Sequence, residues 1–219
     1  MKRTALRFWT VIVLLCMTIS FAMPAYATDG DEVFIPEEFI AEELNAWAEQ
    51  HEIAVRFDNI NVELLDGEMS DDEIEASVRA YVDMMKDAIS NMSSELVCQP
   101  IMSRAVGNYQ ARVESMIPAL GWGYINHDFK ADVSSSKIHS VTLLGNSYDT
   151  GFTIGTWEPN YSWTDISNNK EYLQIYMKGT LNYLWDFMNI SQDATFLDTF
   201  RASGSTLVDA TYHDWPDAD

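Results

Sequence analysis

The sequence predicts an α+β protein in which N-terminal helices precede an antiparallel, β-rich C-terminal half, arranged as a meander or a sandwich. Two observations favour this class. Apolar residues recur with helical spacing before residue 121, and from Tyr124 onward they alternate with polar ones. Turn residues separate the alternating segments at short intervals, which is typical of antiparallel sheets. We therefore expect three regions: residues 1–27, 28–121 and 122–219.

Residues 1–27 have the composition of a secretory signal peptide. Lys2, Arg3 and Arg7 precede an apolar core, and Ala25-Tyr26-Ala27 forms an A-x-A cleavage site. The apolar core is too short for the roughly 20 residues that span a bilayer as a helix. We expect cleavage after residue 27, a secreted, extracellular protein, and no stable membrane span afterwards.

Strong acidity restricts the possible partners. The chain has 219 residues with 34 acidic and 13 basic side chains, and loss of the three basic residues of the signal region gives a net charge of −24. Nucleic-acid binding requires basic clusters that release counterions from phosphates, and anionic lipid surfaces attract the same clusters. The composition therefore argues against both partners.

Cysteine content excludes an internal disulfide after cleavage, because only Cys98 then remains. A lone thiol is most often a small buried apolar side chain, which is the interpretation we adopt. The hydrophobic core must hold the fold.

The region of residues 28–121 contains three helical patterns. Pro36 with two glutamates begins the first, because proline suits the first helical turn and acids complement the helix dipole. Ser70 and Glu73 form a capping box that begins the second, whose apolar face runs to Met92. A third is predicted over residues 106–117, and residues 53–65 between the first two predict a short strand. We expect these helices to pack on the β layer.

The region of residues 122–219 contains alternating segments that predict strands. They cover residues 124–133, 137–144, 151–158, 171–183, 195–201 and 206–212. A hairpin loop is expected between the strands at 151–158 and 171–183, and it contains Trp163.

Catalytic and metal-binding motifs are absent from the sequence. The four histidines form no metal-binding pair, although His127 and His139 could approach each other if their strands were neighbours. The G-x-S-x-G nucleophile motif and glycine-rich phosphate motifs do not occur, and carboxylates are too numerous for any pair to be informative. We assign no catalytic residue, no metal and no cofactor.

Aromatic residues give the most suggestive functional pattern. The expected loop carries Trp157, Tyr161 and Trp163, and one face of the next strand carries Tyr172 and Tyr176 beside amides and hydroxyls. Amphipathic rings supply contact area while polar neighbours fix orientation. These five residues are the predicted ligand-binding site, although the same rings could instead pack into the core or lie under the helices.

The leading hypothesis is therefore a secreted, non-enzymatic binding protein whose aromatic β surface holds a glycan or a protein partner. The alternative is a secreted hydrolase with a cryptic carboxylate or histidine site. A membrane-active role of residues 181–190 is a third hypothesis.

Overall fold

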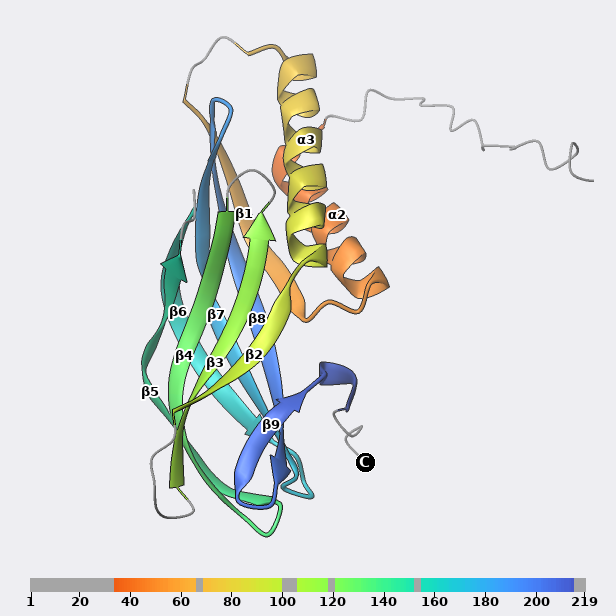
Figure 1. Cartoon of the computed structure of the whole chain (residues 1–219). Coiled ribbons are helices and arrows are strands. Elements are labelled where there is room, and N and C mark those ends of the chain that lie inside the picture. The colour runs from red at the N-terminus through yellow and green to blue at the C-terminus, as the bar shows by residue number, and fades with distance from the viewer. Residues whose placement is uncertain (1–33, 66–68, 100–105, 118–120, 152–154, 215–219) are drawn as a thin grey trace, which may run out of the picture. The chain divides into compact units, whose positions relative to one another are not determined.

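The computed structural model describes residues 34–65, 69–99, 106–117, 121–151 and 155–214 (Figure 1). The expected signal peptide and the side chain of Cys98 lie outside this description. The elements in chain order are α2 (Pro36–Gln50), β1 (Val55–Leu64), α3 (Asp71–Ser90), β2 (Ser93–Gln99), β3 (Val106–Ile117), β4 (Gly121–Ser134), β5 (Lys137–Gly151), β6 (Thr156–Ile166), β7 (Tyr172–Trp185), β8 (Met188–Ser203), β9 (Thr206–Ala210) and the 3₁₀ turn η1 (Tyr212–Asp214).

The strands form two antiparallel sheets. Sheet A has the order β1-β8-β7-β6, with β9 pairing to β8 beyond the end of β1, and sheet B has the order β2-β3-β4-β5. Both α-helices of the described residues lie before residue 91, so the predicted α+β class is confirmed. Strand β1 lies in the N-terminal region of the chain yet pairs with β8, which joins the two regions in one sheet.

Helix α3 forms as the sequence predicts. The Ser70 hydroxyl accepts a hydrogen bond from the Glu73 amide, and the Glu73 carboxylate accepts one from the Ser70 amide, so the capping box is complete. The apolar face of the helix is buried against sheet A, where the Tyr81 ring contacts Tyr183 and Trp185 edge-on. The expected docking of helix on sheet is therefore observed.

The Asn45 side chain makes two hydrogen bonds that fix helix α2 to the edge of sheet A. The Asn45 amide group donates to the Phe57 carbonyl at 2.7 Å and accepts from the Phe57 amide at 2.9 Å. Phe57 lies in β1, so this pair of bonds partly occupies the free edge of that strand. No helix of the described residues is long and apolar enough to cross a membrane.

The core between the sheets consists of the alternating inward residues of both sheets. On β8 every second residue from Met188 to Ala202 is buried, which is the pattern of a strand with one covered face. Three stacked rings, Tyr109 of β3, Phe129 of β4 and Phe200 of β8, connect sheet B to sheet A, with centroids 5.4 and 5.6 Å apart. The arrangement resembles a sandwich in which α3 covers sheet A beyond the end of sheet B.

The predicted helix over residues 106–117 is wrong, because this segment is strand β3. Its apolar residues suit a helical period, yet Tyr109, Ala111 and Val113 also alternate and are all buried. Pairing with both β2 and β4 decides the conformation, since tertiary contacts override local propensity.

The predicted hairpin loop around Trp163 is also wrong. Residues 156–166 form strand β6 at the edge of sheet A, and the chain turns instead at residues 167–171. Pro159 is tolerated there because an edge strand leaves some amides unpaired. Its neighbour Asn160 has no partner on β7 and forms a β-bulge.

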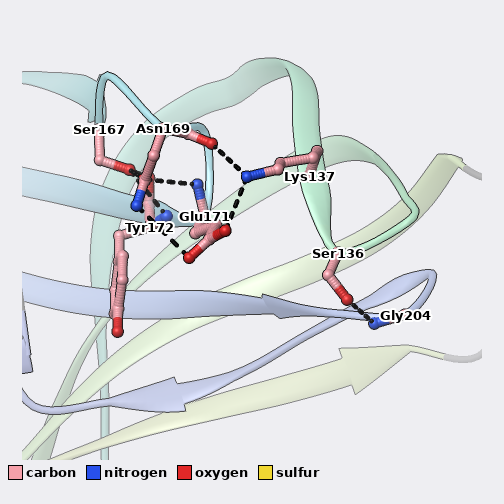
Figure 2. Close-up of polar contacts among 7 residues, drawn as sticks. All are labelled: Ser136, Lys137, Ser167, Asn169, Glu171, Tyr172 and Gly204. Carbon is pink, nitrogen blue, oxygen red and sulfur yellow. Dashed lines mark hydrogen bonds and ion pairs between the residues drawn. The ribbon is translucent and has the colours of Figure 1, made fainter.

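Three hairpin turns meet at one end of the sandwich (Figure 2). The Lys137 ammonium donates to the Asn169 carbonyl at 2.8 Å and contacts the Glu171 carboxylate at 2.7 Å. The Gly204 amide donates to the Ser136 hydroxyl at 2.9 Å. These bonds tie the β4–β5 turn of sheet B to the β6–β7 and β8–β9 turns of sheet A and so fix the separation of the sheets.

Candidate functional site

A row of three aromatic rings lies on the outer face of sheet A, which faces away from sheet B. Trp163 of β6 is directly opposite Tyr176 of β7, and their rings are parallel within 2° with centroids 4.6 Å apart. The Tyr161 ring lies 5.3 Å from that of Trp163. Tyr161 is 57% exposed and Trp163 is 37% exposed, whereas Tyr176 is half-buried. We call these three residues the aromatic row.

The aromatic row borders a groove of about 440 Å³. Thr195 and Leu197 of β8 contribute to it, and the opposite side is formed by the start of β1 and by Tyr212 of η1. The groove is lined by Ile53, Ala54, Val55, Arg56, Asp58, Tyr161, Trp163, Tyr176, Lys178, Thr195, Leu197 and Tyr212. A volume of this size lies within the usual range for small-ligand sites.

The groove contains a small charged group. The Asp58 carboxylate lies 3.1 Å from the Arg56 guanidinium and 3.8 Å from the Lys178 ammonium. Because Asp58 is shared between two cations, each keeps donors for another acceptor. The Arg56 side chain is 75% exposed, so its guanidinium can reach a ligand.

The phenol of Tyr176 is held as a neutral donor. Burial raises the pKa of Tyr176 above its ordinary value, and the negative charge of Asp165 raises it further. The hydroxyl donates to the Gln174 side-chain oxygen at 2.7 Å. This bond orients the ring against Trp163.

The predicted site residues do not all lie together. Tyr161, Trp163 and Tyr176 form the aromatic row, whereas Trp157 is only 6% exposed and packs in the core against Phe196. The bulge at Asn160 explains the separation, because one extra residue turns Trp157 inward and Trp163 outward although both numbers are odd. Tyr172 is half-buried at the end of β7 and does not line the groove.

Sequence reasoning missed the other side of the groove. Arg56 and Asp58 come from β1 and Tyr212 from η1, two elements that are far from β6 in the sequence. Lys178 was visible on the tyrosine face of β7, but its ion pair with Asp58 depends on the β1–β8 pairing. No local sequence signal reveals that pairing.

The histidines form no joint site among the described residues. His127 is fully buried on the inner face of β4, and burial lowers its pKa. His139 is exposed on β5, next to Ser140, which is the residue opposite Asp132. Asp132 is five residues along β4 from His127, which corresponds to about 17 Å at 3.4 Å per residue. The two rings therefore do not approach each other, and no group of three metal-ligating side chains occurs in the described part of the chain.

One serine–histidine contact does occur. The Ser134 hydroxyl lies 2.8 Å from the His139 Nε2 atom. The pair sits at the β4–β5 turn, and neither residue lines the groove.

Comparisons of this chain with protein families, curated proteins and solved structures gave no match. The class of protein is therefore defined by its own features: an α+β fold of two antiparallel sheets with a row of exposed aromatic rings beside a groove.

Proposed function

We propose that this protein is a secreted, non-enzymatic binding protein that holds a neutral glycan in the groove beside the aromatic row. The observation that carries the proposal is the Tyr161–Trp163–Tyr176 row, in which the rings of Tyr161 and Trp163 are exposed. The geometry and the charges of the groove support it in three ways.

The first support is the chemistry of the rings. A pyranose has one face of C–H bonds, which packs favourably on the electron-rich face of an aromatic ring. Trp163 and Tyr176 cover each other's facing surfaces, so a ligand meets their edges and outer faces and the exposed ring of Tyr161.

The second support is the arrangement of polar groups across the groove. Arg56 and Lys178 supply donors and Asp58 supplies acceptors; Arg56 and Asp58 lie on β1, whereas Lys178 lies on β7 beside Tyr161. Sugar hydroxyls both donate and accept, so they match a shared ion pair that offers both roles. An apolar surface with a few placed polar groups is the usual composition of a small-ligand site.

The third support concerns the charge of the ligand. The chain has a net charge of −21 at pH 7, and the two cations of the groove are already partnered by Asp58. The field of the whole protein repels polyanions, so a neutral glycan suits the groove better than a highly charged one.

The test is a glycan array followed by calorimetry with the glycan that binds best. We expect the wild-type protein to bind neutral oligosaccharides and Trp163→Ala to weaken binding about tenfold or more, the usual effect of truncating a central aromatic contact. Tyr161→Ala should also weaken binding.

Phe187→Ala is the matched control, because Phe187 and Tyr161 are both 57% exposed and Phe187 lies outside the groove, in the turn between β7 and β8. We expect this variant to bind like the wild type. Equal binding by the wild type and Trp163→Ala would refute the site, and an array without any bound neutral glycan would refute the ligand class.

The alternative of a secreted hydrolase has one specific observation in its favour, the Ser134–His139 contact. Hydrolysis by such a pair requires a substrate pocket and oxyanion donors beside the serine. Release of products from polysaccharide, peptide or ester substrates that Ser134→Ala abolishes would establish this activity. We favour binding because the aromatic row, not this pair, borders the groove.

A further inference from the structure

A second surface, far from the groove, consists of exposed apolar side chains at the end of sheet A. We call it the apolar tip, and its members are Leu64 and Leu65 at the end of β1, Leu184 of β7 and Phe187 of the β7–β8 turn. They are between 39% and 59% exposed. Leu184 is six residues along β7 from Lys178, about 20 Å from the groove at 3.4 Å per residue.

The four residues belong together in space. The Leu65 amide donates to the Phe187 carbonyl at 2.8 Å, and Leu64 lies directly opposite Met188 in the β1–β8 ladder. Leu64 lies on the face of sheet A that α3 covers, because its partner Met188 is buried there, whereas Leu184 follows the outward residues of β7. The apolar tip therefore includes residues from both faces of sheet A at its end.

Hydrogen bonds from α3 hold the β7–β8 turn, and with it the apolar tip, in one position. The Ser77 hydroxyl of α3 donates to the Asp186 carboxylate, and the Trp185 indole donates to the Ser77 carbonyl at 3.1 Å. Asp186 has a positive φ of 47°, as a two-residue turn between twisted strands requires. A rigid surface loses little conformational entropy when it binds a partner.

Folding does not explain the choice of residues. A two-residue turn favours asparagine, aspartate or glycine, and Asp186 meets that preference, but an exposed phenylalanine at position 187 gains nothing from the turn. Contiguous exposed apolar residues ringed by polar ones mark interaction sites in soluble proteins.

Charge distinguishes between possible partners. The charged residues within two positions of the four are Glu63, Asp66 and Asp186, all acidic. A membrane is disfavoured because Asp186, in the turn itself, would enter the bilayer first, and an ionised carboxylate there is costly. A second copy of the chain is disfavoured because each copy has a net charge of −21.

We infer that the apolar tip docks into an apolar recess, rimmed by lysine or arginine side chains, on another protein. The partner receives Phe187 and Leu184 in the recess, and its basic rim faces Glu63 and Asp186. The chain then joins two targets, because the tip and the groove are at separate places on sheet A.

The test uses a photoreactive amino acid at position 187, and in a second variant at position 184, in the full chain expressed in its own host. Irradiation should cross-link one and the same protein from both positions. The same substitution at Leu144, an exposed apolar residue on β5 of sheet B, is the control and should not capture it.

The captured protein is then purified and its affinity measured. We expect Phe187→Ser and Leu184→Ser to weaken binding tenfold to a hundredfold, as for central apolar contacts, and Leu144→Ser to leave it unchanged. Asp186→Asn should reduce the dependence of the association rate on salt, because it removes one charge facing the basic rim. Unchanged thermal unfolding of each variant shows that the fold is intact.

Three results would overturn the inference: no protein cross-linked from positions 184 and 187, a captured protein that binds Phe187→Ser as tightly as the wild type, or binding of the chain to phosphatidylcholine vesicles that Phe187→Ser abolishes. The last result would assign the tip to a lipid surface. Glycan binding by Phe187→Ser should stay normal in every case, so this test is independent of the groove.

Discussion

Substitution of Gly179 by alanine tests how the core positions the aromatic row. Gly179 is a buried residue of β7, and a Cβ atom on it would lie 2.5 Å from the Trp157 ring and 2.6 Å from the Glu158 carbonyl oxygen. Real Cβ atoms do not approach other atoms so closely. The carbonyl belongs to the backbone of β6, so a rotamer change of Trp157 cannot relieve the whole clash, and β6 must move.

Two opposing effects determine the size of the change. Overpacking a dense core costs about 1–3 kcal/mol. Replacing glycine by alanine in extended backbone restricts the unfolded chain and returns about 0.4–1 kcal/mol. We therefore expect Gly179→Ala to lower the free energy of unfolding by about 1.3 kcal/mol, the midpoint of the overpacking cost less the midpoint of the gain.

Urea unfolding followed by tryptophan fluorescence measures this change. Glycan binding should weaken as well, because Tyr161 and Trp163 follow Glu158 on the displaced strand. In a Trp157→Phe background the substitution should cost less, since the smaller ring removes one of the two clashes, and the difference gives the coupling energy. An unfolding free energy equal to or above that of the wild type would refute the argument.

Two further predictions concern stability alone. The Tyr81 hydroxyl is buried without a hydrogen-bond partner among the described residues, so Tyr81→Phe should stabilise the protein by about 1 kcal/mol in thermal or urea unfolding at pH 7. Burial also raises the pKa of Tyr81 well above 10. Above pH 10 the Tyr81 phenol therefore loses its proton in the unfolded chain but keeps it in the folded chain, so the free energy of unfolding falls as the pH rises. We expect this fall to be less steep in Tyr81→Phe. Ser135 has a φ of 53° in the β4–β5 turn, and asparagine tolerates this conformation better than serine. Ser135→Asn should therefore raise the free energy of unfolding by roughly 0.5 kcal/mol, seen as a higher midpoint of urea unfolding. A lower midpoint would show that Ser135 has contacts that outweigh its backbone conformation.

The parts of the fold that the sequence predicts are those with local signals. Helix α3 carries its own capping box at Ser70 and a continuous apolar face, so no distant residue is needed to recognise it. Strand β7 shows a regular alternation, and the outward position of Tyr176 follows from parity alone. These signals were enough for the α+β class and for one side of the groove.

The parts that failed depend on distant pairing. Residues 106–117 suit a helix or a strand equally by apolar spacing, and only their place between β2 and β4 decides. Trp157 was assigned to the binding surface because it was expected in one hairpin loop with Trp163, whereas both residues lie in β6 and the bulged residue Asn160 turns them to opposite faces. Pro159 was a local signal beside the bulge, because proline in a strand is confined to edges, first residues and bulges, but it does not fix which residue is the extra one.

The pairing of β1 with β8 has a consequence for the order of assembly. Val55 meets Phe196, so sheet A acquires its outermost strand only after nearly the whole polypeptide is available. Closing so long a loop costs entropy before any contact compensates for it, which makes folding slow and leaves sheet edges open meanwhile. A chain shortened before residue 188 would lose both the partner of β1 and one side of the groove, although every residue of the aromatic row would still be present.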